Sequence, residues 1–251
     1  LKKIEYNNYD GCPYQALGVL YSKLNLTINS TKNFIKAAEI EYYIDYPQYE
    51  AALSCFSSSD YKCSLKYINR AIKIKNNSKY YDLKGYTLLM IGNINQAQNK
   101  FLISKSNDSI AGLGHIHLIK KDYKNAQKLL NYSYVNLIQK LQKKERIDYI
   151  SLLAPIGLGW SYSNQNEHDK SIKYYDFVLQ IDPINFLALI GKANSLSGLK
   201  KYHDANIILD KTLDIYPNNP YALSEKGLIL LNLNQSNNSK DLFIEALNLE
   251  N

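Results

Sequence analysis

The 251-residue sequence is poor in residues that interrupt helices, with only 11 glycines and 6 prolines. That scarcity favours a mostly helical protein. No run approaches the roughly 18 consecutive apolar residues of a membrane-spanning helix, so no transmembrane segment is predicted. No signal peptide is visible, and the sequence begins with Leu1 rather than Met. We therefore interpret it as an excerpt or a processed chain.

Arginine is almost absent: Arg70 and Arg146 are the only two among 30 basic residues, although the net charge is +7. Nucleic-acid and phosphate sites favour arginine forks, so this composition predicts no dedicated nucleic-acid site. One alternative stays open, a basic surface that binds nucleic acid or an anionic envelope through Lys140, Lys143, Lys144 and Arg146.

Cysteine is also rare, and Cys12, Cys55 and Cys63 form no CxxC pair. The odd count predicts free thiols, which favours a reducing, cytoplasmic compartment. Glycosylation sequons nevertheless leave a surface or secreted protein open. They begin at Asn25, Asn29, Asn76, Asn107, Asn131, Asn234 and Asn237.

The sequence lacks any arrangement that predicts chemistry. His115 and His117 are two residues apart on an expected helix, so they point to different faces and cannot share one metal. No motif positions a Ser/His/Asp or Cys/His set, and the Gly-Leu-Gly segments lack the preceding strand of a phosphate loop. We predict no catalytic, cofactor or metal site and no enzyme activity in this chain. The recognition arm of a larger enzyme remains an alternative.

What the sequence does contain is a repeated unit, best seen in residues 186–219. Its first half spaces Leu189, Ala193 and Leu196 three and four apart, as on one face of a helix. The second half does the same with Ala205, Leu209 and Thr212, and Pro217 ends it. A lone pair of such helices cannot bury both faces, so it needs neighbours.

The register of small residues supports seven units. In the first helix they recur at 18, 52, 85, 114, 159, 193 and 227, with steps of 34, 33, 29, 45, 34 and 34. The second helix repeats these steps twelve residues later in every unit. The expected units are 11–44, 45–77, 78–106, 107–140, 152–185, 186–219 and 220–251, with residues 1–10 ending an earlier helix.

Three segments of this unit carry a family resemblance: Lys192-Ala193-Asn194-Ser195-Leu196, Tyr202-His203-Asp204-Ala205 and Leu213-Asp214-Ile215-Tyr216-Pro217-Asn218-Asn219. They resemble the tetratricopeptide repeat, whose period is about 34 residues. The resemblance implies an all-α fold, a right-handed α-solenoid of antiparallel helix pairs. It also implies a concave face lined by the first helix of each pair.

The step of 45 contains eleven extra residues at 141–151, which we expect to form a helical insertion. Pro155 predicts a kink or a late start in the helix that follows. Units 1–4 and 5–7 are therefore expected to form two sub-solenoids.

The concave face suggests a protein-binding site. We predict a non-enzymatic scaffold that holds a peptide or helix of a partner protein in an apolar, aromatic groove. The candidate residues are Tyr46, Tyr49, Leu53, Phe56, Tyr86, Leu89, His115, Leu118, Ile156, Trp160 and Asn194. The last unit offers Tyr221, Ser224, Leu228 and Leu231 at the same helical positions.

Two alternatives bear on this groove. Neighbouring helices of the protein itself could fill it, and the apolar ends of the solenoid make self-association an option. The related mode in which such repeats clamp a chaperone's carboxylates is not predicted. Asn194 fits that mode, but Ile190 stands where its lysine is needed.

Overall fold

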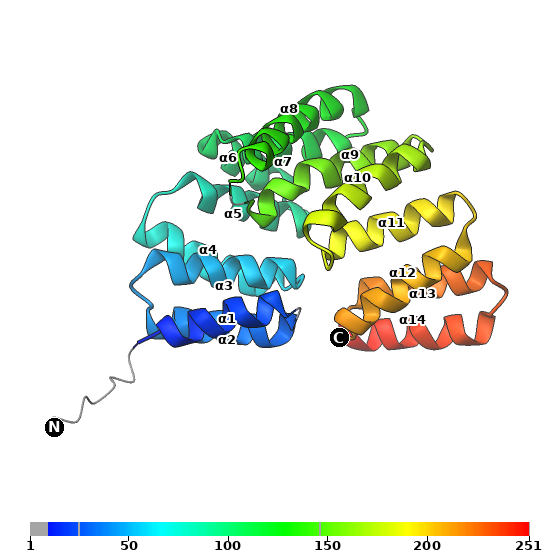
Figure 1. Ribbon diagram of the computed structural model, residues 1–251, viewed down its shortest axis with the longest axis horizontal. Coiled ribbons are helices and arrows are strands. Elements are labelled where there is room, and N and C mark those ends of the chain that lie inside the picture. Colours follow the sequence, from blue (N-terminus) through cyan, green and yellow to red (C-terminus); the bar gives the residue numbers. More distant parts are fainter. Residues whose placement is uncertain (1–9, 25, 146, 251) are drawn as a thin grey trace. The chain divides into compact units, whose positions relative to one another are not determined.

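The computed structural model describes residues 10–24, 26–145 and 147–250, and these residues form fourteen α-helices, one 3₁₀-helix and no strand (Figure 1). The helices of the first three repeats are α1 (Cys12–Lys23), α2 (Thr27–Ile40), α3 (Asp45–Ser57), α4 (Tyr61–Ile74), α5 (Ser78–Met90) and α6 (Ile94–Ser104). The others are α7 (Asn107–Ile119), α8 (Tyr123–Gln142), η1 (Tyr149–Leu152), α9 (Leu153–Asn164), α10 (His168–Ile181), α11 (Phe186–Gly198), α12 (Tyr202–Ile215), α13 (Pro220–Asn232) and α14 (Ser236–Glu250). The prediction that residues 1–10 end a helix concerns mainly residues outside this description; Asp10 itself is not helical.

Consecutive helices pack in pairs, and each pair also contacts the next pair within its unit. We call the first helix of each pair helix A and the second helix B. The described residues contain seven such pairs, which matches the number of repeats expected from the sequence. The all-α solenoid predicted from the repeats is confirmed.

A small residue on helix A packs against a large residue on helix B sixteen positions later. Gly85 shows why it must be small: a Cβ there would lie 2.5 Å from the Phe101 ring. Gly18 faces Phe34, Gly114 faces Leu130 and Gly159 faces Tyr175 in the same way. Gly227 and Phe243 complete the series in the last repeat. This close approach brings the two helices of a repeat together.

Serine hydroxyls strengthen the same contact. Ser171 Oγ donates to the Gly159 carbonyl at 2.7 Å, and Ser239 Oγ donates to that of Gly227 at 2.8 Å. Ser30 and Gly18 make the equivalent bond at 2.9 Å. The partners are twelve residues apart in each case, so the twelve-residue register seen in the sequence corresponds to a physical contact between the helices.

The turns between helix A and helix B are alike. Each turn of repeats 2–7 holds one residue with positive φ, seven positions after the small residue of helix A, at Ser59, Gly92, Lys121, Asn166, Lys200 and Asn234. A left-handed residue just beyond a helix end reverses the chain sharply. Helices A of repeats 6 and 7 are started by Asn185 and Asn219, whose side chains each accept the backbone N–H three residues on, at 3.1 Å.

The described residues divide into two compact units, one that ends at Ser106 and one that begins at Asn107. The expected division between repeats 4 and 5 is therefore wrong. The boundary coincides instead with the short step of 29 residues, where helix α6 has only 11 residues. The insertion does not separate repeats 4 and 5 because the long helix α8 packs against α9 and η1.

The expected helical insertion at 141–151 is only partly helical. Helix α8 continues through Gln142, so the first residues of the insertion lengthen this helix to 20 residues. Lys143 and Lys144 form a turn, and the 3₁₀-helix η1 begins only at Tyr149. Pro155 is the third residue of α9, near the helix start where proline is tolerated.

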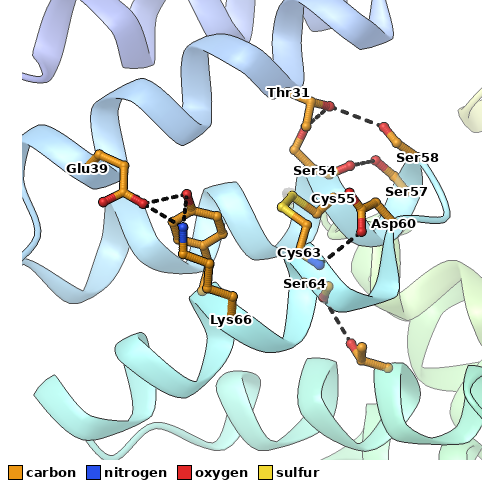
Figure 2. Close-up of a disulfide and its surroundings, with 12 residues drawn as sticks. Thr31, Glu39, Ser54, Cys55, Ser57, Ser58, Asp60, Cys63, Ser64 and Lys66 are labelled. Carbon is orange, nitrogen blue, oxygen red and sulfur yellow. Dashed lines mark hydrogen bonds and ion pairs between the residues drawn. A yellow bond between two sulfur atoms is a disulfide. The ribbon is translucent and has the colours of Figure 1, made fainter.

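Cys55 and Cys63 form a disulfide across the turn between α3 and α4 (Figure 2). The expectation of free thiols is therefore wrong for these two residues, and the preference for a reducing compartment loses its basis. Among the described residues Cys12 is the free cysteine, and it is exposed. The pairing was hidden in the sequence because it depends on the turn that brings the end of α3 beside the start of α4.

We expect the disulfide to stabilise residues 10–106 through the nine-residue loop that it closes, which contributes about 2–3 kcal/mol. Reduction of the wild-type chain should lower the denaturant midpoint, and Cys63→Ser should lower it to a similar extent. A Cys12→Ser control should behave like wild type. Thiol titration of the unfolded, unreduced chain should find one thiol; three thiols would contradict the disulfide.

The Tyr175 ring is held between two glycines of neighbouring A helices. A Cβ at Gly159 would lie 2.8 Å from this ring, and one at Gly191 would lie 2.3 Å from it. Because Tyr175 is 3% exposed, its ring has no free space to move into. We expect Gly191→Ala to destabilise the fold by about 1–3 kcal/mol in urea unfolding. Adding Tyr175→Leu should recover part of this loss; a fully additive double variant would argue against the steric cause.

Candidate functional site

The eleven candidate groove residues do not share one environment. Tyr46 and Trp160 are exposed, while Leu53, Leu89 and Asn194 are half-buried. The remaining six are buried: Tyr49, Phe56, Tyr86, His115, Leu118 and Ile156. The expectation that these six form an open aromatic groove is therefore wrong, because the protein's own residues cover them.

In the first unit, three of the buried candidate rings pack against other rings of the same unit. Tyr86 lies edge-on to Phe101 at a centroid distance of 4.9 Å, within repeat 3. The Tyr49 and Tyr80 rings are 5.1 Å apart, and those of Phe56 and Tyr61 are 5.8 Å apart. These spacings are typical of aromatic packing in a protein core.

His115 is buried and has a structural role in residues 107–250. Its ring lies 2.8 Å from the Leu153 carbonyl, measured from Nε2, so Nε2 carries the proton and donates to this oxygen. Burial lowers the pKa of His115 to about 4, and the bond to Leu153 only partly opposes this shift. The neutral histidine thus joins helix α7 to the start of α9.

Trp160 differs from these buried residues because 40% of its surface is exposed. It lies on α9, one position after the small residue Gly159. The same position is occupied by Asn194 on α11 and by Leu228 on α13, and α11 contacts both α9 and α13. Leu228 is 48% exposed.

Two further apolar residues of α13 lie at candidate positions. Tyr221 is 53% exposed and Leu231 is 44% exposed. We call the surface formed by Trp160, Asn194, Tyr221, Leu228 and Leu231 the A-face of repeats 5–7.

A polar group interrupts this A-face. The Tyr221 hydroxyl lies near the carboxylate of Glu225 and the side chain of Asn194, and partial burial followed by the nearby Glu225 raises the pKa of Tyr221 to about 12. Burial also raises the pKa of Glu225, although contacts with Tyr221 and Asn194 oppose the shift. Sequence reasoning missed Glu225, since the period of the repeat alone does not separate it from ordinary helix-surface charges.

Two lysines on the helices that carry this group, Lys192 and Lys226, are paired elsewhere. Lys192 Nζ lies 2.7 Å from Asp176, and Lys226 Nζ lies 2.6 Å from Asp210. The two pairs are 34 residues apart and join helix B of one repeat to helix A of the next. They leave the A-face without these cations.

In the other unit, a shallow pocket of about 450 Å³ lies between helices α2 and α4 and is lined by Glu39, Tyr42, Arg70, Lys73 and Ile74. Glu39 accepts hydrogen bonds from Tyr67 at 2.7 Å and from Lys66 at 2.9 Å. Arg70 adds a third bond at 3.0 Å, and together these donors lower the pKa of Glu39 to about 2. These hydrogen bonds and ion pairs stabilise the Glu39 carboxylate, so we assign this group of residues a structural role.

One group of possible metal ligands occurs among the described residues: Asp10, Cys12 and Glu41 have ligand atoms within 4.8 Å of one another. Glu41 is already engaged, because it accepts the Gly11 N–H at 3.1 Å and approaches the Gln15 amide. Asp10 accepts the Cys12 N–H at 2.9 Å at the start of α1. These bonds hold the N-terminal end of α1 in place, which gives the three residues a structural role.

The basic residues of the alternative site lie at the end of α8. Lys140 is in the last turn of this helix, and Lys143 and Lys144 follow it on the surface. Cations at this end of a helix stabilise its dipole. Arg146, the fourth member, lies outside the described residues.

Residues 156–185 match the family model described as tetratricopeptide repeat. They cover most of α9 and all of α10. This part of the chain is thus similar to a tetratricopeptide repeat. This family is built on a fold that generally serves as a protein-interaction scaffold.

Two curated proteins are similar in sequence. The TPR repeat-containing protein MJ1428 of Methanocaldococcus jannaschii is 24% identical over 88% of this chain and 33% of its own length. DnaJ homolog subfamily C member 7 of Mus musculus is 23% identical over 77% of this chain and 41% of its own length. The chain thus spans well under half of either relative.

Two solved structures share the fold. The chain matches the structure titled APC/C hetero-tetramer Cut9-Hcn1 with a TM-score of 0.60 and 17% identity, over 90% of this chain and 44% of the other. A tetratricopeptide repeat protein from Parabacteroides merdae matches with a TM-score of 0.53 and 12% identity, over 95% and 93% of the two chains. None of the helices in the described residues has the length and hydropathy needed to cross a membrane.

The buried His115 predicts a pH dependence of stability. Its pKa in the folded protein is about 4, below the ordinary 6.5, so the unfolded chain binds the proton more tightly. Stability should therefore fall as the pH drops from about 6.5 towards 4, by about 2 kcal/mol between pH 7 and pH 5. His115→Gln, which keeps a donor for Leu153, should remove most of this change in urea unfolding. The exposed His203→Gln should retain it; equal pH profiles for wild type and His115→Gln would refute the assignment.

Proposed function

We propose that this chain is a non-enzymatic scaffold that holds a peptide or helix of a partner protein on the A-face of repeats 5–7. The exposure of Trp160 is the observation that carries the proposal. Tryptophan is enriched among the residues that dominate binding energy at protein interfaces. Here the only tryptophan of the chain is 40% exposed, whereas the other aromatic residues among the eleven candidates, apart from Tyr46, are packed inside the protein.

The surroundings of Trp160 fit an extended contact. Leu228 lies at the equivalent position two repeats later, and Tyr221 and Leu231 lie on the same helix as Leu228. Adjacent packed helices are about 8–10 Å apart, so Trp160 and Leu228 are separated by roughly 16–20 Å. A bound helix of about 11–13 residues would reach both.

This proposal moves the site expected from the sequence to the last three repeats. Tyr49, Phe56 and Tyr86 leave the site because their rings are buried. Trp160 stays in it, and the exposed apolar residues of α13 join it. Asn194 stays within the site and contributes a polar group between the two apolar ends.

Replacing Trp160 and Leu228 together by alanine should strongly weaken partner capture. A central aromatic anchor contributes about 2 kcal/mol or more, so we expect capture to weaken at least about 30-fold. Both side chains are exposed, and the unfolding midpoint should stay within the range of surface substitutions. The matched control is Ile207→Ala on α12, which removes a side chain that is 64% exposed on a B helix.

The measurement uses a photo-crosslinking amino acid at Leu231 of the A-face or at Ile207, followed by mass spectrometry of the adducts from the source cells. The proposal expects a specific adduct at Leu231 that the same label at Ile207 does not form. Undiminished capture by the double variant would contradict the proposal.

A further inference from the structure

We infer that the segment held on the A-face carries a basic side chain, which pairs with Glu225 between the two apolar ends of the site. The inference rests on the proposed function and specifies its partner as an amphipathic, cationic peptide. It follows from the position, partners and surroundings of this one carboxylate.

Glu225 lies among the residues that form the A-face. It is half-buried on α13, one turn after Tyr221 and three residues before Leu228. Its polar neighbours are the Tyr221 hydroxyl and the Asn194 side chain, both uncharged. Among the ion pairs of the described residues, none includes Glu225.

A half-buried carboxylate without a cation is costly, because it has lost part of its hydration without gaining a charge partner. The adjacent Lys226 does not serve, since it reaches away to Asp210. Lys192, which precedes Asn194 on α11 by two residues, is held by Asp176. The repeated ion pairs therefore hold both cations away from Glu225.

A basic side chain from a partner would complete this group. A lysine or arginine between apolar residues can lay its methylene stem along an apolar surface while its charge reaches the carboxylate. On a helical partner, the cation would lie between leucine-like residues that contact Trp160 at one end and Leu228 at the other. Charge complementarity of this kind sets specificity and register more than total affinity.

The overall charge of the chain opposes the binding of a basic peptide. The chain has a net charge of +7, which disfavours a basic partner at long range. At physiological ionic strength this repulsion is screened beyond about 8 Å, whereas a contact at Glu225 is not. A preference for a basic peptide must therefore come from the local site.

The test uses three synthetic 14-residue peptides with capped ends, no aromatic residues and leucines along one helical face. They differ only at a central position on that face, which is lysine, glutamine or glutamate. Binding is followed by the fluorescence of Trp160, the single tryptophan of the chain. We expect the lysine peptide to bind at least tenfold more tightly than the glutamate peptide.

Glu225→Gln should remove that preference, and Glu245→Gln, at an exposed position of α14, should preserve it. If all three peptides bind with equal affinity and lose binding in Leu228→Ala, which keeps the Trp160 signal, the inference is overturned while the proposed site stands. If none of them binds to the wild-type chain, the apolar site fails together with the inference. A lysine preference that persists in Glu225→Gln would also overturn it.

Discussion

The fold depends on one contact, that between a small residue of helix A and a large residue of helix B sixteen positions later. Gly85 against Phe101 and Gly159 against Tyr175 leave no room for even one added methyl group. Close packing of this kind is what makes protein interiors sensitive to single carbon atoms. The serine bonds twelve residues apart, as from Ser171 to Gly159, hold the same two helices at that distance.

This contact also determines which aromatic residues remain available for binding. Once the helices of a repeat approach closely, rings such as Tyr86 meet the large residue of helix B and become core. The chain is rich in tyrosine, with 23 residues, but richness alone makes no binding surface. Trp160, Tyr221 and Leu228 stay exposed on helices A of the second unit, and there the apolar surface is interrupted by a carboxylate.

The similarity to known proteins reaches as far as the fold. The relatives and solved structures are 12–24% identical to this chain in sequence. The two solved structures share its helical fold, with TM-scores of 0.53 and 0.60. The side chains exposed on helix A are free to differ between such proteins, because they do not support the contact between helices A and B. The proposed binding therefore depends on side chains particular to this chain, those of the A-face and Glu225.

The sequence by itself determined the helix pairs and their number, since the register of small residues reflects a contact that must recur in every repeat. Helix starts and turns followed from local chemistry, as at Asn185 and Pro155. The tertiary structure alone decided the rest. The disulfide between Cys55 and Cys63 forms because a turn brings the ends of two helices together. The division after residue 106 depends on how closely each helix pair packs against the next pair. Burial of Tyr49 and exposure of Trp160 depend on neighbours distant along the chain, which a helical period cannot specify.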